Sequence, residues 1–378
     1  MTTFDAVAAG HICLDIIPQL PAIDLQKLLV PGGVSEIGPA LLQTGGPVSN
    51  TGRNLDRLGI RTRLMGKIGD DPFGEIVLRL IRAQDPRLVE NMIVAPGETT
   101  AYTIVISPPR FDRFFLHCAG ANHTFGADDV PYDRLHEARL FHFGYPPFMK
   151  RMYTREGEEL VEMYRRAKAA GVLTSLDLAL PDPDGPSGQV NWRRVLEKTL
   201  PYVDLFLPSL DELLFMLRRD QPPPDVHPDT LIADVAAEVL DMGARLVGIK
   251  LGSRGLYLRT GAEGTGPLAA PGWQNRELWA ACFRPEPLVG TTGSGDATIA
   301  GFLAGVLHGQ TLEAALTSAV GVGGCNVEAA DALSGVLSWR ATQARIQAGW
   351  PRSTVTIDAP GWRWDDAHQL WIGPHDRG

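Results

Sequence analysis

The chain has 378 residues, of which 44% are hydrophobic and 21% charged, and its formal net charge is −9 at neutral pH. This composition is ordinary for a globular enzyme and offers no basic surface for nucleic acid or for an acidic membrane. The four cysteines, Cys13, Cys118, Cys282 and Cys325, form no CxxC pair, so neither a zinc site nor a disulfide framework is predicted. No apolar run reaches the ~18 residues of a membrane span, and the N-terminus lacks a signal-peptide pattern, which favours a cytoplasmic protein.

The first third of the chain predicts a short strand, an irregular stretch, two helices and a hairpin. An apolar strand over residues 4–10 ends at a glycine, and residues 16–46 contain Pro and Gly with weak periodicity. Residues 48–58 and 73–83 have apolar residues at helical spacing. Residues 99–107 and 113–118 are rich in β-branched and aromatic residues and predict two paired strands.

From residue 140 onwards, short apolar strands alternate with helices. Strands are predicted at 140–143, 172–178, 203–207 and 246–250, and helices at 156–170, 210–217, 231–242, 298–307 and 312–322. This alternation predicts βαβ units and a mostly parallel sheet, which binds ligands at the carboxyl ends of its strands. Residues 181–189 and 221–228 are rich in Pro and Asp and predict surface insertions.

The strongest local signal is the segment VGTTGSGDA at residues 289–297, which leads into the apolar helix predicted at 298–307. A glycine turn at a helix N-terminus presents free N–H groups and the positive end of the helix dipole, an arrangement that suits phosphate oxygens. Asp296 stands beside this predicted anion site, where its carboxylate could accept a proton from an attacking hydroxyl. On local composition alone, the alternative is that Asp296 only caps the helix.

The segment GTTGSGDATIAGF, residues 290–302, resembles the DTTGAGDxFxxGF signature of the ribokinase-like (PfkB) kinases. Other elements follow in the order typical of that family. They are Gly10-His11 with Asp15, Gly45-Gly46 with Asn50, GKIGDDPFG at 66–74, Gly120-Ala121-Asn122, Pro208 to Glu212, and Lys250-Leu251-Gly252 with Gly255. The ordered set covers about residues 4–335 and is specific, although each element alone is weak.

The resemblance implies an α/β ribokinase-like fold with three αβα layers, a mostly parallel central sheet and a small β-rich lid. One kinase domain is expected over residues 1–345, with lid segments inserted at about 16–46 and 99–122, and a C-terminal extension over 346–378. A lid excludes water from the phosphoryl group. In many family members the lid also makes the dimer contact, so a homodimer through the lid is a further expectation.

The activity implied is ATP-dependent transfer of the γ-phosphoryl group to a hydroxyl of a sugar. Asp296 would be the catalytic base, and the backbone N–H groups of Gly293, Ser294 and Gly295 would hold the transferred phosphoryl charge. Mg²⁺ would neutralise the triphosphate mostly through waters, and Glu212 matches the family glutamate that organises this metal indirectly. The nucleotide-binding positions carried over are Lys250, Gly252, Gly255 and Thr292.

The acceptor-binding positions carried over are Asp15, Gly45, Gly46, Asn50 and Asn122. Carboxylate and amide side chains suit paired sugar hydroxyls, and glycines let the sugar ring approach the backbone. Three of the carried-over residues also have a purely structural interpretation. Asp15 could be a strand-end turn residue, Asn50 the N-cap of a helix over 51–58, and Glu212 an acid in a first helical turn.

The sequence departs from the family pattern at several positions. Gly290 replaces the first Asp of DTTGAGD, which in some relatives contributes to a monovalent-cation site, so potassium activation is in doubt. Ser209 replaces the asparagine of the family's NxxE motif. The segment 177–181 lacks the Asn and Arg of DxNxR, and Pro47 replaces a lysine found in ribokinases and phosphofructokinases. These differences favour a neutral sugar or a nucleoside over an acidic sugar.

Two alternatives stay open. A nucleoside kinase of the same fold is favoured by the aromatic residues Tyr102, Phe111, Phe114 and Phe115 in the predicted lid. A non-catalytic binding or regulatory protein of this fold would be favoured by loss of Asp296, which is present. A dinucleotide-binding dehydrogenase is excluded because no GxGxxG follows the first strand, and a Walker-type P-loop is excluded because Gly66-Lys67 is followed by Ile68.

Overall fold

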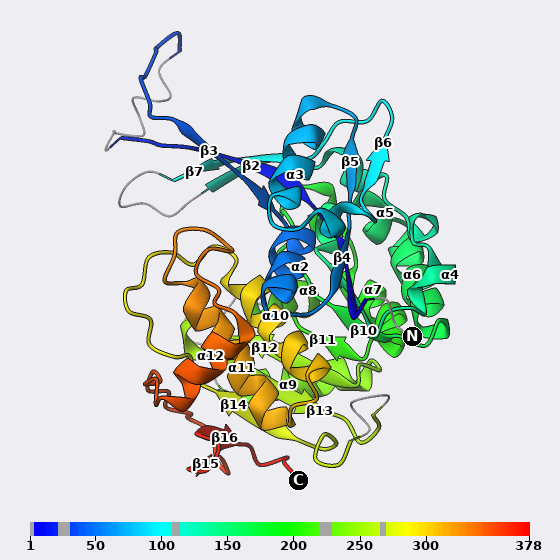
Figure 1. Cartoon of the computed structure of the whole chain (residues 1–378). Helices are drawn as coiled ribbons and strands as arrows, with labels where there is room; N and C mark the ends of the chain where they lie inside the picture. The colour runs from blue at the N-terminus through cyan, green and yellow to red at the C-terminus, as the bar shows by residue number, and fades with distance from the viewer. Residues whose placement is uncertain (1–3, 22–30, 108–113, 220–228, 265–269) are drawn as a thin grey trace.

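The computed structural model describes residues 4–21, 31–107, 114–219, 229–264 and 270–378. Within these residues the main element is a ten-stranded sheet with the order β15-β16-β14-β13-β12-β11-β10-β9-β1-β4 (Figure 1). The pairs from β4 to β12 are parallel, whereas β13, β14, β16 and β15 pair antiparallel. The strands are β1 (Ala6–Gly10), β4 (Thr62–Met65), β9 (Leu140–Gly144), β10 (Leu173–Leu176), β11 (Leu205–Phe206), β12 (Leu246–Lys250), β13 (Leu256–Thr260), β14 (Glu277–Ala280), β15 (Arg363–Asp365) and β16 (Leu370–Ile372).

Helices cover both faces of this sheet because adjacent strand residues point to opposite faces. Leu140, Leu205 and Leu246 belong to one buried cluster, whereas their neighbours Phe141, Phe206 and Val247 belong to the other. The cluster that contains Phe141 also contains side chains of α6 (Glu158–Ala169), α7 (Trp192–Thr199), α8 (Leu210–Leu217) and α9 (Asp229–Asp241). The cluster that contains Leu140, on the opposite face, also contains side chains of α2 (Pro47–Arg57), α10 (Ser294–Leu307) and α11 (Leu312–Asn326). The predicted three-layer αβα fold is confirmed.

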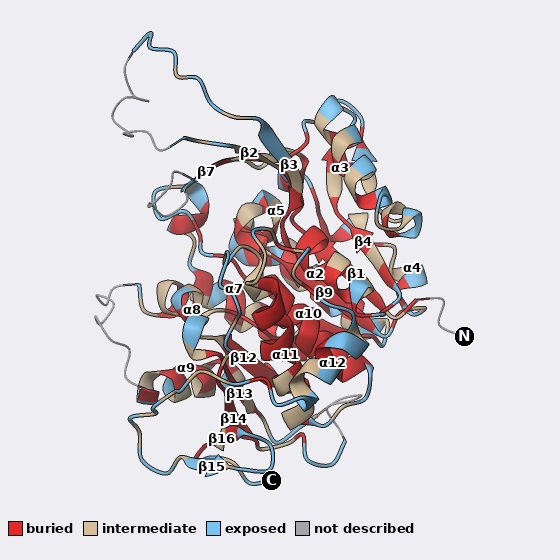
Figure 2. Ribbon diagram, turned by 60° about the vertical axis from the view of Figure 1, so that its left-hand side comes forward, coloured by how far each residue is buried: buried red, intermediate tan, exposed pale blue. Residues whose placement is uncertain are grey.

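Helices α10 and α11 are buried on nearly all sides, as Figure 2 shows. Their contact is close because Gly301 of α10 faces Val322 of α11, with no room for a Cβ between them. Burial of each large aliphatic or aromatic side chain in this layer stabilises the fold by about 1.5–3 kcal/mol. This packing fixes the position of the first turn of α10, which carries Asp296.

A four-stranded sheet with the order β3-β2-β7-β8 projects away from the main body (Figure 1). Its strands are β2 (Cys13–Pro18), β3 (Ala40–Gly45), β7 (Tyr102–Ile106) and β8 (Phe114–Cys118). The predicted hairpin pairing is confirmed, since β7 and β8 are antiparallel neighbours. The predicted small β-rich sheet is therefore present. Helix α3 (Pro72–Arg82) packs against β2 and β3, and the short pair of β5 (Lys67–Gly69) and β6 (Ile93–Ala95) lies next to α3.

Most predicted elements are found within a few residues, and α10 is the main correction. It begins at Ser294, four residues before the predicted start, so Asp296 lies inside its first turn. Helix α11 runs four residues further than predicted, to Asn326. The predicted insertion at 221–228 and Phe111 lie outside the described residues. The insertion at 181–189 is largely exposed, but Ser187 is buried and its carbonyl accepts a hydrogen bond from Trp192 Nε1.

The last residues of the chain add to the edge of the central sheet. Strand β16 pairs with β14, and β15 pairs with β16. Trp362 packs edge-on against Trp279 at a centroid distance of 5.8 Å. The remaining short helices are α4 (Tyr132–Leu135), α5 (Lys150–Tyr153) and α12 (Trp339–Gln347). In the described part of the chain, no helix has the length and apolar character needed to cross a membrane.

Candidate active site

Polar side chains gather where the parallel strands end. His11, Tyr145 and Asp177 come directly after β1, β9 and β10, and Lys250 is the last residue of β12. Because the carboxyl ends of parallel strands share one edge of a sheet, these residues face a common region. The N-terminus of α10, which carries Asp296, reaches the same region, as its contacts show.

The Asp296 carboxylate is buried and accepts hydrogen bonds from three residues distant in sequence. The donors are Asn50 Nδ2 at 3.0 Å, Thr51 Oγ1 at 3.2 Å, and the Tyr145 hydroxyl at 3.1 and 3.2 Å from the two carboxylate oxygens. Asp296 is not the helix cap, since that position belongs to Gly293. The interpretation of Asp296 as a mere cap is therefore wrong.

Burial raises the pKa of Asp296 above that of an ordinary carboxyl group. The hydrogen bonds from Asn50, Tyr145 and Thr51 and the positive charge of Lys250 act in the opposite direction. Burial also raises the pKa of Tyr145, so its hydroxyl remains a hydrogen-bond donor at neutral pH. A carboxylate in such a setting is suited to accept a proton near neutral pH.

The turn before α10 requires glycine at its N-cap. Gly293 has φ 70°, in the left-handed region, and a Cβ there would collide with the Ala332 side chain. The N–H of Ser294 donates to the Thr291 carbonyl at 3.2 Å, which closes the turn. Of the three predicted phosphoryl donors, Ser294 is thus already engaged. At Gly295, the nearest atoms to a Cβ would belong to the Lys250 side chain, at 3.6 Å.

A cavity of about 320 Å³ lies beside this turn. Several predicted residues line it, namely Lys250, Gly252, Gly255, Ser294 and Gly295. Apolar side chains such as Phe283, Leu288 and Val327 form much of the remaining wall. Thr292, the other predicted nucleotide-binding residue, does not line the cavity, but its hydroxyl is buried without a partner among the described residues. A cavity with an apolar wall next to a helix N-terminus has the features of a nucleotide site.

Lys250 is fixed by a buried ion pair with Asp177. Its ammonium donates to Asp177 Oδ1 at 2.5 Å and to the Leu207 carbonyl at 2.8 Å. Burial by itself would lower the pKa of Lys250, but the carboxylates of Asp177 and Glu212 raise it above its ordinary value. Lys250 therefore stays positive and contributes to the electrostatic field around Asp296.

Glu212 occupies a capping box at the start of α8. The Ser209 N–H donates to Glu212 Oε2 at 2.6 Å, and Ser209 Oγ accepts from the Glu212 N–H at 3.3 Å. The structural interpretation of Glu212 as a first-turn acid is thus correct, and Ser209 serves as the N-cap. Its indirect metal role remains a prediction. No group of three or more His, Cys, Asp or Glu side chains within the described ranges could hold a metal directly.

Of the predicted acceptor residues, Asn50 contacts Asp296 directly, whereas Asp15 and Gly45 belong to the lid strands β2 and β3. The Asp15 carboxylate packs against Gly45, where a Cβ would collide with it, and burial raises the pKa of Asp15 to about 6. Gly46 is the N-cap of α2 with φ 84°. Asn50 lies inside α2, so its interpretation as an N-cap is wrong. Its Oδ1 atom is buried without a partner in the described part of the chain.

Asn122 is placed differently from the other predicted acceptor residues. Its Nδ2 donates to the carbonyls of Ile12 at 2.9 Å and Ala119 at 3.1 Å, and its Oδ1 accepts from the Ile12 N–H at 3.1 Å. The amide is thus bonded to the backbone on both ends. It connects the lid-side turn at 120–123 to the segment after β1.

Four rings form a wall next to Asp296 that sequence reasoning missed. The His11 ring lies 5.0 Å from His117, 5.5 Å from Phe148 and 6.2 Å from Tyr145, measured between centroids. Burial lowers the pKa of both histidines, that of His117 to about 4, so both are neutral at neutral pH. Tyr145 has φ 63°, an uncommon backbone conformation for a bulky residue and often a mark of a functional position. The available signal was the position of His11 directly after one predicted strand and of Tyr145 two residues after the end of another.

The family model of the pfkB family carbohydrate kinases matches residues 6–339. An uncharacterized sugar kinase of Archaeoglobus fulgidus is 26% identical over 259 residues, 68% of this chain and 88% of that protein. A cytidine kinase of Thermococcus kodakarensis is 24% identical over 310 residues, 82% of this chain and 91% of that protein. The structure of an Arabidopsis thaliana ribokinase complexed with ribose and ATP has a TM-score of 0.71 at 17% identity, covering 90% of this chain and 98% of that chain.

The family match defines a phosphotransferase whose acceptor is a hydroxyl group. The chain belongs to the PfkB family of carbohydrate kinases, because the family model covers nearly its whole length. It is an ATP-binding sugar kinase in this broad sense, and the ribokinase-like fold agrees with the structural neighbours.

Proposed function

We propose that the protein transfers the γ-phosphoryl group of ATP to a hydroxyl of a neutral sugar, with Asp296 as catalytic base. The observation that carries this proposal is the position of the Asp296 carboxylate. It is buried in the first turn of α10, next to Ser294 and Gly295, which line the cavity of about 320 Å³, and it accepts a hydrogen bond from the predicted acceptor residue Asn50. A base in this place lies between a nucleotide and an acceptor, where phosphoryl transfer requires it.

In the proposed reaction the acceptor hydroxyl donates its proton to Asp296 while its oxygen attacks the γ-phosphorus. The bond from that phosphorus to the β-phosphate oxygen breaks, and ADP leaves. The first turn of α10 presents backbone N–H groups and the positive helix end to the transferred phosphoryl group. The Tyr145 hydroxyl bridges the two carboxylate oxygens at the position that an acceptor hydroxyl would approach, so it holds the base in place and moves aside or shares the carboxylate when the acceptor binds.

Magnesium is proposed to enter with the nucleotide. It would neutralise part of the triphosphate charge and so favour attack by the acceptor oxygen. Glu212 fits an indirect role, because one carboxylate oxygen is fixed by the Ser209 N–H while its negative charge also acts on Lys250 and Asp177. A single carboxylate held in this way suits the water shell of Mg²⁺ better than direct coordination.

The chemistry of the acceptor side supports a neutral ligand. Asp15 and Asn50 supply a carboxylate and a free amide oxygen for sugar hydroxyls. The adjoining wall of His11, His117 and Phe148 is uncharged, so it offers no cation to an acidic sugar. Rings of this kind also stack on planar bases, and this observation favours a nucleoside as the second candidate acceptor.

The test is ADP release from MgATP in the presence of a panel of sugars, sugar acids, sugar phosphates and nucleosides. A neutral sugar should stimulate ADP release, and Asp296→Asn should abolish the stimulation. Stimulation only by nucleosides would favour the second candidate. If no acceptor on the panel stimulates release from an enzyme that binds ATP, the proposal is wrong for these classes of acceptor.

We also propose a homodimer through the lid. Strand β8 is an edge strand, and Phe114, Phe115 and Leu116 on it are 45%, 57% and 58% exposed. An edge strand with exposed apolar side chains is a surface that a second chain can cover. Light scattering during size exclusion should give the mass of a dimer, and Phe115→Glu should shift it to that of a monomer. A monomeric wild-type protein would disprove this arrangement.

A further inference from the structure

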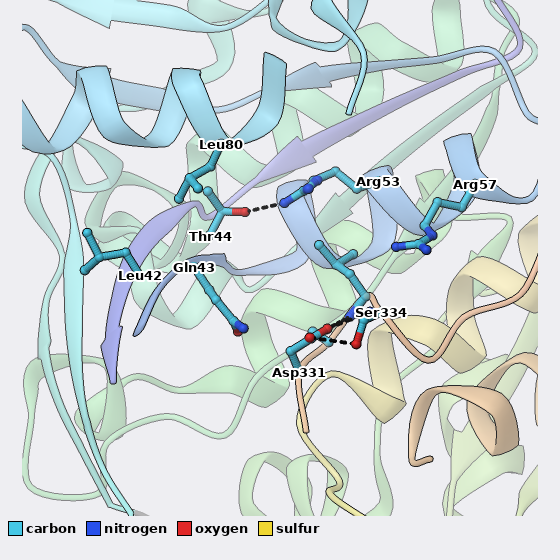
Figure 3. Close-up of a pocket in the computed structure, with 10 residues that line it drawn as sticks. Leu42, Gln43, Thr44, Arg53, Arg57, Leu80, Asp331 and Ser334 are labelled. Atoms are coloured by element: carbon cyan, nitrogen blue, oxygen red, sulfur yellow. Dashed lines mark hydrogen bonds between the residues drawn. The ribbon is translucent and has the colours of Figure 1, made fainter. Parts of the chain in front are cut away.

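A second hollow lies between the lid and the outer part of α2. It has a volume of about 260 Å³ and is surrounded by side chains from β3, α2, α3 and the turn at 331–334 (Figure 3). Its polar lining residues are Gln43, Thr44, Arg53, Arg57, Asp331 and Ser334. None of the proposed acceptor or nucleotide residues lines it, so it is separate from the proposed active site.

Arg53 reaches this hollow from one turn beyond Asn50. Its Nε donates to Gln84 Oε1 at 3.0 Å and its Nη1 to Thr44 Oγ1 at 2.8 Å, and both acceptors are neutral. Burial and the nearby charge of Arg57 lower the pKa of Arg53 to about 10, which leaves the guanidinium protonated at neutral pH. The charges of Asp331 and Asp56 act in the opposite direction. The fold thus holds a partly buried cation that, among the described residues, donates its hydrogen bonds to neutral acceptors.

Asp331 is the acid that lines the hollow, and its carboxylate is used within its own turn. Its Oδ1 accepts from the N–H groups of Leu333 at 2.8 Å and Ser334 at 2.6 Å, and its Oδ2 accepts from the Ser334 hydroxyl at 2.7 Å. Within the residues that the structure describes, neither Arg53 nor Arg57 has a carboxylate at salt-bridge distance. The charge of Arg57 and the burial of Arg53 disfavour the protonated form of Arg53, although the charge of Asp331 attracts both arginines.

We propose that this hollow binds a phosphoryl anion, either inorganic phosphate or the phosphate group of a small phosphorylated sugar. The forked guanidinium groups of Arg53 and Arg57 match the geometry of phosphate oxygens, and an anion would offset the repulsion between them. The amide of Gln43 and the hydroxyl of Ser334 are neutral donors at the wall of the same hollow. This inference concerns a separate site and holds whichever acceptor the enzyme uses.

The location of the hollow connects it physically to the active-site turn. Asn54, which follows Arg53 on α2, donates through Nδ2 to the Ala332 carbonyl at 3.1 Å. The Ala332 side chain in turn packs against Gly293, the N-cap of α10. A ligand that contacts the turn at 331–334 therefore contacts a segment that itself packs against Gly293, at the start of the helix that carries Asp296.

The test is calorimetric titration of the full chain, first saturated with magnesium and a non-hydrolysable ATP analogue so that the nucleotide site is filled. Inorganic phosphate and glucose 6-phosphate are titrated in separate experiments. At least one should bind, and Arg57→Gln and Arg53→Gln should each weaken binding about tenfold, the effect expected from loss of one charge-assisted contact. Phosphate binding alone would identify the free ion as the ligand, and tighter binding of glucose 6-phosphate a phosphorylated sugar.

Two controls make the result specific. Arg82→Gln removes an exposed arginine of α3 and should leave binding unchanged. Arg57 is exposed, so Arg57→Gln should fold normally even if Arg53→Gln does not, and thermal melting checks both variants. Binding that Asp15→Asn weakens and Arg57→Gln does not would place the ligand in the acceptor site and overturn the proposal. Absence of binding by either ligand would overturn it as well.

Discussion

Asp296 owes its properties to residues far from it in the sequence. The donors Asn50 and Thr51 come from α2 and Tyr145 from the end of β9, some 150 to 250 positions away. The motif around Asp296 was sufficient to predict the residue and the helix that carries it. It could not predict Thr51 or Tyr145, because their contact with Asp296 depends on which strand ends and helices become neighbours in the folded chain.

Thr51→Val should shift the pH dependence of the reaction. The Thr51 hydroxyl stabilises the ionised form of Asp296, so its loss should raise the pKa of Asp296. The acidic limb of the profile of kcat/KM against pH should then move to higher pH by about one unit, since a hydrogen bond to a charged group contributes about 1.5–3 kcal/mol. Thr62→Val is the control, because its hydroxyl donates to the Ile60 carbonyl and, among the described residues, has no hydrogen bond to the site. An unmoved limb in Thr51→Val would argue against Asp296 as the titrating base.

Asp15 should make acceptor binding depend on pH. Burial raises the pKa of Asp15 to about 6, above its usual value near 4, so the native protein takes up a proton as the pH falls through 6. Protonation removes the charged acceptor of sugar hydroxyls, and the KM for the acceptor should rise below pH 6. Because the folded-state pKa is raised, the protonated carboxyl favours the fold at low pH, and this stability is lost as pH rises from about 4 to 6. In Asp15→Asn, the KM should be higher and nearly flat over this range, and a persistent rise below pH 6 would assign the effect to another group.

At the scale of secondary structure, hydrophobic periodicity predicted most helices and strands within a few residues. Helix α10 was the exception at its start, because Gly293 and Gly295 suggest an irregular loop when read locally. In the structure Gly293 supplies the left-handed N-cap, and the helix begins immediately after it. The close packing of α10 on α11 holds this glycine-containing first turn in helical form, which local propensity alone does not favour.

Gly293→Ala should therefore damage both folding and catalysis. Alanine at φ 70° is strained, and its Cβ would also collide with Ala332. We expect a loss of about 1–3 kcal/mol in the free energy of unfolding and a large decrease in kcat, because the turn that presents Asp296 must shift. Gly309→Ala is the matched control: φ is 73°, but no atom lies within 4 Å of its Cβ. Gly309→Ala should cost some stability and leave kcat unchanged, and equal kcat in both variants would contradict the role of the Gly293 turn.

At the scale of the whole molecule, the sequence predicted the three layers and the lid but not the place of the last residues. The segment after residue 345 showed only short β-like pieces, whereas the structure adds β15 and β16 to the edge of the central sheet. Pairing between β14 and β16 joins segments about 90 residues apart, and no local pattern specifies it. Asp376 strengthens this junction through a bond to Arg276 Nε at 2.9 Å and another to the Glu277 N–H at 3.0 Å.

Asp376→Asn should test how firmly this end of the chain supports the fold. Asp376 and Arg276 are 2% and 8% exposed, so loss of the carboxylate leaves a buried arginine with Glu313 as its remaining acidic partner. A decrease of about 2–4 kcal/mol in the free energy of unfolding is expected in urea titrations. The exposed Asp366→Asn is the control and should change stability by less than about 0.5 kcal/mol. Equal stability of the two variants would mean that the last residues contribute little to the fold.

The central claim is that Asp296 accepts the proton of the acceptor hydroxyl, and Asp296→Asn tests it most directly. The variant keeps the size of the side chain but removes its basicity. We predict a decrease in kcat of about a hundredfold to ten-thousandfold, while the dissociation constant for MgATP stays close to that of the wild type, because only the proton acceptor is lost. Turnover near the wild-type rate in a correctly folded Asp296→Asn enzyme would contradict the claim and assign proton removal to another group.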